Sequence, residues 1–404
     1  MSDGVAYLQT TTAIRERCRN VLTAVRAGKS KWLTVNDATL AGAAAKVANV
    51  TRERYPTLAI PYHSRWRHFE PGGVNRKALL DAALGDVSPA ERARAHIDLA
   101  VVSVLLDAGA GAAWRYAEAS TGQTFSRSEG LGIASFHAFV KGEFSSDPSQ
   151  PFRADADGLK ALTSARLAAV FQVAPDNALI GLEGRANLMQ SLGAALASQP
   201  KWFGSDMRPG GLFDVLTENS SRKSIRAGEV LGALLHGLGS IWPSGNQLDG
   251  IALGDCWRHP LAGGTGATAG WIPIHKLSQW MTYSLLEPFE WAGVQLTDLD
   301  ALTGLAEYRN GGLLVDSGVL AAAPALFSQA YSPSDEPIIE WRALTVALLD
   351  ELAPLVRTDL GVSAANLPLA CILEGGTWAA GRALATSLRG GEPPIRIVSD
   401  GTVF

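Results

Sequence analysis

The sequence predicts a mainly α-helical globular protein with few short strands. Hydrophobic residues make up 47% of the 404 residues and charged residues only 18%, which is enough apolar surface for a large folded core. Apolar side chains recur at helical spacing along much of the chain, as at Leu188, Leu192 and Leu196. Strand patterns are scarce, and one short candidate is the run 395–398, which follows two prolines.

Two helices have clear start signals. The segment SPAE, residues 88–91, reads as a capping box with proline at the first helical position, and it predicts a helix that runs to about Asp107. The segment DEP, residues 335–337, is a similar start for a second helix, because an acidic residue precedes a proline and an apolar periodic run.

A further helix is expected after Pro273, with two different faces. Its apolar stripe contains Leu277, Trp280, Met281 and Leu285. Its second stripe contains Lys276, Gln279, Tyr283 and Glu287. One cation, one amide, one phenol and one carboxylate suit a ligand pocket. A half-buried helix whose polar groups satisfy each other explains this stripe equally well.

A compact Glu-Tyr-Arg-Asn-Gly-Gly segment follows that helix. Thr297 or Asp298 can cap a short helix, and the glycine pair 311–312 would end it, because glycine accepts the left-handed backbone of a helix exit. The residues expected at this helix end are Glu307, Tyr308 and Arg309. The carboxylate and the guanidinium form either a plain salt bridge or a catalytic acid or base beside a phosphate-binding cation.

Three weaker candidates lie in glycine-containing segments. Asp249 and Asp255 occupy glycine-flanked turns, where a side chain can point at a ligand, although an Asx turn is the simpler interpretation of each. Glu374 lies in LEGGTWAAGR, which we interpret as a ligand loop leading into a helix or as a structural helix start. His63 and His68 stand five residues apart, a poor spacing for a metal pair on one helix face.

The bulk properties exclude several classes. A formal net charge of −4 argues against a dedicated nucleic-acid binder. The N-terminus has no basic segment followed by an apolar run, and the apolar stretch 99–106 is too short to span a bilayer. The 3 cysteines are scattered and form neither a disulfide framework nor a zinc motif. We therefore expect a cytoplasmic protein with no metal, no cofactor and neither a nucleic acid nor a membrane as partner.

The chain carries no repeat and no low-complexity linker. Residues 1–80 are richer in loop signals, and we expect them to form an N-terminal layer on a helical catalytic core of residues 81–404, within one structural unit. The tail 399–404 ends on an apolar residue after a tight turn, which favours a docked C-terminus.

Seven segments together resemble the Urc/Urg-type uracil-catabolism family, formerly a domain of unknown function. They are IPYHSRWRHFEPGG, FSSDP, IPIHKLSQWMTYSLLEP, LTGLAEYRNGGLLVDSGVL, EWRALTVALLDEL, LEGGTWAAGR and the terminal SDGTVF. The resemblance covers nearly the whole chain. It implies a role in pyrimidine catabolism, in a pathway that opens the uracil ring while it carries a ribosyl group and later frees urea.

A fainter resemblance suggests a reaction. LLDAGAGAAWR, GRANLMQSLGAAL and HKLSQ…LTGLAEYR are similar to queuosine-salvage nucleotide glycohydrolases, which are helical and related to DNA glycosylases. The family pattern, roughly K-R-x-Q and then carboxylate-Tyr-Arg, falls on Lys276, Gln279, Glu307, Tyr308 and Arg309. Glu307 replaces an aspartate, and Ser284 occupies the acidic position of the preceding helix. The base-recognition half of the pocket is therefore expected to differ, as a smaller leaving group would require.

These resemblances imply a helical glycohydrolase fold and an N-glycoside hydrolase that releases urea or a pyrimidine-derived fragment from a ribosyl or ribosyl-phosphate compound. Glu307 is the first choice for the catalytic carboxylate, with Asp249 or Asp255 as a second acid or a ribose ligand. The expected substrate-binding residues are Lys276, Gln279, Tyr283, Tyr308, Arg309, Trp280, Arg342 and Glu374.

Two other functions stay open at this point. One is an amidohydrolase or deaminase that acts on the opened ring, for which the sequence offers no convincing set of metal ligands. The other is a non-enzymatic ligand-binding partner in the same pathway. A DNA glycosylase is least expected, given the acidic charge balance. A homo-oligomer is compatible with the sequence, since apolar surface for a dimer cannot be told from core at this level.

Overall fold

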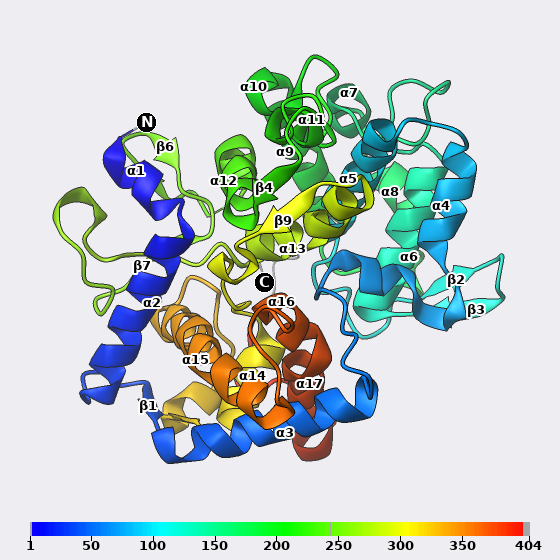
Figure 1. Cartoon of the computed structure of the whole chain (residues 1–404). Helices are drawn as coiled ribbons and strands as arrows, with labels where there is room; N and C mark the ends of the chain where they lie inside the picture. The colour runs from blue at the N-terminus through cyan, green and yellow to red at the C-terminus, as the bar shows by residue number, and fades with distance from the viewer. Residues whose placement is uncertain (1, 243, 399–404) are drawn as a thin grey trace. The chain divides into compact units, whose positions relative to one another are not determined.

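The computed structural model of the chain describes residues 2–242 and 244–398. The expected mainly α-helical class is confirmed, because helices dominate these residues and every strand is only two or three residues long (Figure 1). The further likeness to helical glycohydrolases stays a prediction. The tail 399–404, with its expected docking, lies outside the described residues.

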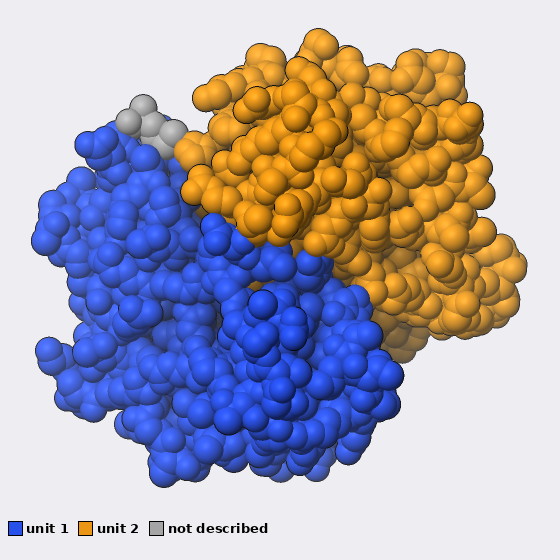
Figure 2. Space-filling view, in the orientation of Figure 1, with its two compact units in different colours: residues 1–63, 245–279, 298–398 blue, residues 64–244, 280–297, 399–404 orange. Residues whose placement is uncertain are grey.

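The chain divides into two compact units, each built from separated segments (Figure 2). Unit 1 contains residues 1–63, 245–279 and 298–398, and unit 2 contains residues 64–244, 280–297 and 399–404. The expected layer of residues 1–80 on a core of residues 81–404 stays a prediction. The two units group residues by proximity in space and not by their order along the chain.

Unit 1 holds both chain-terminal groups of helices and the helices that carry most of the expected site residues. Its helices are α1 (Asp3–Leu8), α2 (Thr11–Arg26), η1 (Asp37–Thr39), α3 (Leu40–Arg54), η5 (Gly266–Thr268), η6 (Leu299–Ala301), α14 (Tyr308–Asp316), η7 (Pro324–Phe327), α15 (Glu336–Leu360), α16 (Leu369–Ile372), the π-helix η8 (Leu373–Thr377) and α17 (Trp378–Arg389). Its strands are β1 (Leu33–Val35), β5 (Gln247–Leu248), β6 (Ile251–Ala252), β7 (Cys256–Arg258), β8 (Trp271–Pro273) and β10 (Leu320–Ala322).

Unit 2 is built around several short helices and two longer ones. Its helices are η2 (Arg65–Phe69), η3 (Pro71–Gly73), α4 (Arg76–Leu84), α5 (Pro89–Leu105), α6 (Arg127–Val140), α7 (Ala156–Lys160), α8 (Ser164–Val170), α9 (Leu182–Ser198), α10 (Pro200–Phe203), α11 (Gly211–Leu216), α12 (Ala227–Leu238) and η4 (Gly239–Ile241). Its strands are β2 (Tyr116–Glu118), β3 (Gln123–Phe125), β4 (Ser224–Arg226) and β9 (Gln295–Thr297). Helix α13 (Lys276–Trp291) begins in unit 1 and passes into unit 2 after Gln279.

Helix α15 forms the centre of unit 1. It packs against α2 and α3 (Figure 1), and most of its buried residues are apolar. The predicted start is confirmed, since Asp335 is the N-cap residue and Pro337 lies in the first turn. Gly361 ends the helix with a φ of 70°, a left-handed conformation that glycine adopts at little cost.

Helix α5 plays a comparable part in unit 2. The hydroxyl of Ser88 accepts a hydrogen bond from the backbone N–H of Glu91 at 3.1 Å, as its capping sequence predicts. The helix ends at Leu105, slightly before the expected end at Asp107. No helix in the described part of the chain is long and apolar enough to cross a membrane.

The strands form five separate two-stranded pairs among the described residues. The pairs β1–β10, β2–β3, β5–β6 and β7–β8 are antiparallel, with Leu33 opposite Ala322 and Cys256 opposite Pro273, whereas β4 and β9 are parallel. The prediction of a strand at 395–398 was wrong, because this segment makes only an isolated bridge, between Ile397 and Tyr331.

Candidate functional site

The carboxylate of Glu307 is the N-cap of helix α14. Its backbone is extended, and its two oxygens accept hydrogen bonds from the backbone N–H groups of Arg309 at 2.9 Å and Asn310 at 2.6 Å. Two of the unpaired donors at a helix start are thus satisfied by one side chain. Both oxygens are held in a fixed orientation, which is a requirement for a carboxylate that must face a reacting atom.

The expected helix boundaries in this region were wrong. Residues 299–301 form only the short 3₁₀ helix η6, and α14 runs from Tyr308 to Asp316 straight through the two glycines. The segment before it is extended and buried, because Gly304 lies against Leu349 of α15, where a Cβ atom would come within 2.7 Å of that side chain. Glu307 therefore stands at a helix start and not at a helix end.

The glycines of α14 serve close packing rather than helix termination. A Cβ atom on Gly311 would come within 2.8 Å of the indole of Trp341 on α15, whose Nε1–H donates to the Gly311 carbonyl at 3.2 Å. On α17, a Cβ atom on Gly381 would come within 2.1 Å of the carbonyl oxygen of Arg309. Helices α14 and α17 can lie side by side in unit 1 because this glycine has no side chain (Figure 1).

The surroundings of Glu307 combine burial with positive charge. Burial raises the pKa of this carboxyl, and the backbone hydrogen bond from Arg309 and the charge of Lys276 oppose that rise. His63 acts on the pKa of this carboxyl in the same direction as Lys276. A carboxylate with a raised pKa is a stronger base than an exposed one.

Tyr308 and Arg309 extend the site along the start of α14. The guanidinium of Arg309 is buried, lies 4.8 Å from the ring centroid of Tyr308 and donates to the carbonyl of Gly391 at 2.9 Å. Tyr308 is 38% exposed. An aromatic ring at the surface beside a guanidinium offers a stacking face and a positive charge to a sugar phosphate.

A second buried carboxylate, Glu374, lies in the same unit. The guanidinium of Arg54 and the hydroxyl of Tyr55 donate to its Oε1 at 2.9 and 3.1 Å, and Nδ1 of His63 lies 2.8 Å from its Oε2. Burial alone would raise its pKa, but the hydrogen bond and charge of His63 and the charge of Arg54 outweigh that effect and lower it to about 2.

The segment of Glu374 is a π-helix that leads directly into α17, which agrees with the interpretation as a structural helix start and not with the ligand loop. A Cβ atom on Gly376 would come within 2.5 Å of both the Thr51 hydroxyl and the Val47 carbonyl of α3. The glycine therefore lets the π-helix lie against α3, which carries Arg54 at its end. π-Helical turns are rare in proteins as a whole, but those that occur are often found at functional sites.

Asp255 and Arg342 form a buried ion pair. The guanidinium of Arg342 donates to both Asp255 oxygens, at 2.9 and 2.7 Å, and the Lys276 backbone N–H donates to Oδ2 at 2.8 Å. Burial would raise the pKa of Asp255, but the charge and hydrogen bonds of Arg342 outweigh burial and lower it. These contacts anchor the start of α13 and favour a positioning role for Asp255. Direct roles for Asp255 and Arg342 in catalysis or substrate binding stay predictions.

Asp249 has a local explanation. It occupies the two-residue turn Asp249-Gly250 between β5 and β6, both residues have positive φ, and the aspartate is exposed. Asp-Gly is a preferred sequence for this type of hairpin turn. Its expected catalytic role stays a prediction.

The polar stripe expected on α13 is divided between the two units. Lys276 and Gln279 belong to unit 1, where the Gln279 amide donates to the Thr303 hydroxyl at 2.7 Å. Trp280, Tyr283 and Glu287 belong to unit 2. Within unit 2, Glu287 is bound by Arg67 at 2.8 Å and by Ser64, and the Arg65 guanidinium lies 5.7 Å from the Trp280 ring. Substrate-binding roles for these residues stay predictions.

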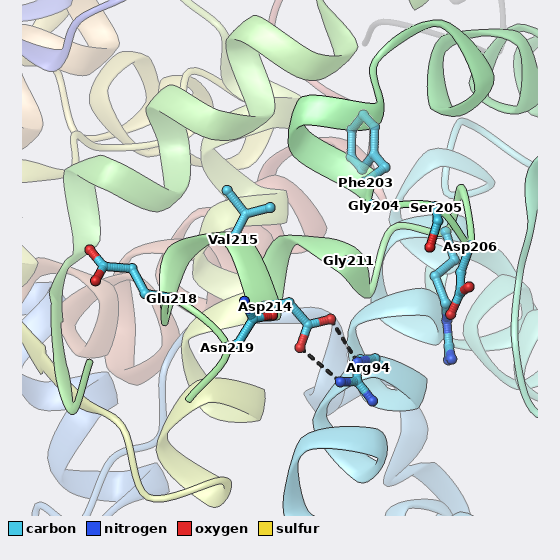
Figure 3. A pocket seen from close by; sticks show the side chains of 11 residues that line it. Arg94, Phe203, Gly204, Ser205, Asp206, Gly211, Asp214, Val215, Glu218 and Asn219 are labelled. Carbon is cyan, nitrogen blue, oxygen red and sulfur yellow. Dashed lines mark hydrogen bonds and ion pairs between the residues drawn. The ribbon is translucent and has the colours of Figure 1, made fainter. Parts of the chain in front are cut away.

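A polar hollow of about 450 Å³ lies in unit 2 (Figure 3). Arg94 on its wall forms a two-bond ion pair with Asp214, both bonds being 2.8 Å, and a third bond of 2.8 Å to Glu91. None of the expected site residues lines it. In the described part of the chain, no group of three or more His, Cys, Asp and Glu side chains is arranged to hold a metal ion.

The pairing of His63 with Glu374 was not predicted from the sequence. His63 was considered only as half of a metal pair with His68, whereas its carboxylate partner lies 311 residues further along the chain. The neighbouring histidine and arginines gave no hint of this pairing. A search for buried carboxylates near each histidine requires the fold.

The fold and this site define a mainly α-helical protein whose unit 1 contains the buried carboxylates of Glu307 and Glu374 together with His63 and Arg54. The chain belongs to the family described as "Protein of unknown function (DUF1688)", whose model matches residues 7–404. It is 36% identical to "Uracil catabolism protein 4" of Lachancea kluyveri, over 99% of both chains. It is 39% identical to "Protein urg3" of Schizosaccharomyces pombe, over 100% of both chains.

Proposed function

We propose that this protein is an N-glycoside hydrolase of uracil catabolism, which releases urea or a related pyrimidine-derived fragment from a ribosyl or ribosyl-phosphate compound. The pathway is supported by the full-length similarity to a protein named for uracil catabolism. The reaction is supported above all by Glu307, a buried carboxylate fixed by two backbone hydrogen bonds and faced by the charges of Lys276 and His63.

In this reaction Glu307 orients a water molecule toward the anomeric carbon and accepts its proton. The raised pKa suits the carboxylate to this task, since a general base works best when its pKa approaches the ambient pH. Its negative charge also stabilises the oxocarbenium-like charge that develops on the sugar as the bond to nitrogen breaks. Lys276 and Arg309 bind the phosphate or polarise the urea carbonyl, and Tyr308 packs on the sugar.

The direct test is to incubate the purified protein with ribosylurea and with its 5-phosphate, with and without chelator, and to assay urea and free sugar. We expect urea together with ribose or ribose phosphate, at a rate that the chelator leaves unchanged. If neither compound is cleaved, the proposed function is wrong. Cleavage that stops in chelator would instead favour a metal-assisted hydrolase.

Two variants of Glu307 separate catalysis from helix capping. Glu307→Gln keeps the length of the side chain but cannot accept a proton, so we expect a loss of at least about 100-fold in kcat, roughly 3 kcal/mol of barrier. It also turns an amide toward a backbone N–H, which should cost about 1 kcal/mol of stability. Glu307→Asp keeps the charge, and we expect it to retain more activity than the glutamine variant.

Thermal unfolding of both variants provides the control. If Glu307→Gln retains kcat within about tenfold of the unmodified protein, Glu307 serves as a cap and another group is the base. If both variants lose activity in proportion to their loss of folded protein, the effect is structural.

A further inference from the structure

His63 acts electrostatically on the candidate catalytic carboxylate Glu307 and has no role in the reaction described above. Its side chain is only 7% exposed. Its backbone N–H donates to the carbonyl of Ala370 at 3.0 Å, and its ring centroid lies 6.4 Å from that of Trp378 at the start of α17. The backbone of His63 is therefore fixed by a hydrogen bond, and the Trp378 ring lies near its imidazole.

The tautomer of His63 follows from its partner. Glu374 lies 2.8 Å from Nδ1, and its pKa of about 2 means that it is an ionised acceptor at neutral pH. An ionised carboxylate only accepts hydrogen bonds. Nδ1 is therefore the protonated ring nitrogen, and its N–H donates a hydrogen bond to Glu374. Nε2 is then the ring nitrogen that takes up and releases the second proton of the imidazole.

Glu374 is itself held in place. Its other oxygen accepts hydrogen bonds from Arg54 and Tyr55 at the end of α3, and the π-helix that carries it lies against the same helix. The charged groups that act on this pair are Arg54 from α3, which pairs with Glu374, and Glu307 from the start of α14, on which His63 acts.

We propose that His63, oriented by Glu374, is the catalytic acid that protonates the leaving nitrogen group when the glycosidic bond breaks. The inference rests on the proposed N-glycoside hydrolysis and assigns the second half of its acid–base chemistry. Glu374 is in this view a positioning residue, which fixes the tautomer and the orientation of the ring, rather than a ligand of the substrate.

The step balances as follows. The bond between the anomeric carbon and nitrogen breaks, and its electron pair passes to nitrogen, which receives the proton from Nε2 of His63. The oxygen of water forms the new bond to the anomeric carbon, and its proton passes to Glu307. Transfer of that proton through solvent from Glu307 to His63 restores the starting state. Urea is a poor leaving group as an anion, so protonation in the transition state lowers the barrier.

The test is the pH profile of urea release by the full-length protein and by His63→Gln, Glu374→Gln and the control His236→Gln, whose histidine lies on α12 in unit 2. We expect His63→Gln to lose about 100-fold or more in kcat with little change in KM. We also expect it to lose the fall in rate at high pH that a proton donor causes. Glu374→Gln should show a smaller loss, and His236→Gln none.

Three results separate the proposals. If the unmodified protein cleaves neither ribosylurea nor its 5-phosphate, the proposed function fails and this inference fails with it. If the unmodified protein is active but His63→Gln keeps kcat within about tenfold, or keeps the alkaline fall in rate, only the role of His63 is overturned. If His63→Gln does not fold, the profile of the unmodified protein decides, because a rate that does not fall at high pH contradicts a histidine donor.

A spectroscopic readout is independent of turnover. A proton on Nδ1 that is held by a buried carboxylate should give a downfield imidazole NH resonance in the unmodified protein. This resonance should be absent from His63→Gln and shifted in Glu374→Gln. A resonance that does not move in Glu374→Gln would show that Glu374 does not orient the ring.

Discussion

Three carboxyl groups of this chain show how one type of side chain acquires different properties from its surroundings. Burial raises the pKa of Glu307, burial raises that of Glu287 to about 7, and the cations around Glu374 lower its pKa to about 2. The differences come from partners distant in sequence, such as Ser64 and Arg67 for Glu287. A residue pattern can name such a carboxylate, but only the fold gives its proton affinity.

Glu287 yields a prediction about stability and pH. Its folded pKa of about 7 exceeds its usual 4.5, so between these values the folded state binds a proton that the unfolded state does not. The free energy of unfolding therefore falls as pH rises through this window, by about 3 kcal/mol at most. Glu287→Gln removes this titration, so its stability relative to the unmodified protein should increase from pH 4.5 to 7.

Denaturant unfolding of both proteins at several pH values measures this difference. Glu290→Gln removes an exposed carboxylate from the same helix whose charge adds the smallest of the named contributions to the raised pKa of Glu287, so as a control it should change the slope less than Glu287→Gln does. A stability difference for Glu287→Gln that is independent of pH would mean that Glu287 is ionised throughout, with Arg67 compensating for its burial.

At the scale of elements, local chemistry predicted helix starts well and helix ends poorly. The starts at Ser88 and Asp335 followed from capping residues and an adjacent proline, which act within one turn. The start of α14 was missed because its cap is a glutamate, an uncommon capping residue. Its glycines predicted a helix exit, whereas Gly311 lies against Trp341 and Gly312 against Pro394, contacts that the sequence does not reveal.

The same limit applies to the candidate site. Glu307, Lys276 and Arg309 were predicted from a polar helix stripe and a compact Glu-Tyr-Arg segment, to which a resemblance was then added, and Lys276 acts electrostatically on Glu307 in the structure. The pair His63–Glu374 was not found, because its two halves are 311 residues apart and meet only when the π-helix lies against α3. The stripe expected on α13 stays a prediction, and the helix that carries it begins in unit 1 and continues into unit 2.

Gly381 yields a prediction at this scale. A Cβ atom here would come within 2.1 Å of the Arg309 carbonyl, so Gly381→Ala must push α17 away from the start of α14, where Glu307 lies. We expect a loss of about 1–3 kcal/mol of stability and a lower rate of urea release. The control is Gly228→Ala in α12, where a Cβ atom meets nothing within 4 Å. There alanine should stabilise the helix by about 0.5–1 kcal/mol. Equal effects of the two substitutions would contradict the packing argument.

At the scale of the whole molecule, buried and half-buried ionisable groups of opposite behaviour set the pH range of stability. One set consists of carboxyls whose pKa is lowered to about 2, namely Glu118, Glu229 and Glu374. A second set consists of carboxyls whose pKa burial raises to about 6 or 7, namely Asp98, Glu287 and Glu340. A third set consists of histidines whose pKa burial lowers to about 4, namely His96 and His259.

The signs of these shifts predict where the protein is most stable. The first set stabilises the fold above about pH 4.5 and loses this contribution as pH falls toward 2, which makes the acid limb steep. Between pH 4.5 and 6.5 the raised carboxyls lower stability as pH increases, while the two neutral histidines raise it, so the opposing slopes largely offset each other. Above 6.5 the histidines contribute no further gain, and the raised carboxyls continue to lower stability up to about pH 7. We therefore expect a plateau of maximal stability at about pH 5 to 6.5, measurable by guanidinium unfolding from pH 3 to 8.

In the double variant Glu287→Gln/Glu340→Gln the plateau should extend to higher pH, because the carboxyls that cause its alkaline edge are gone. Stability that rises steadily to pH 8 in the unmodified protein would show that Glu287 and Glu340 are ionised in the folded state at neutral pH, and would overturn this assignment.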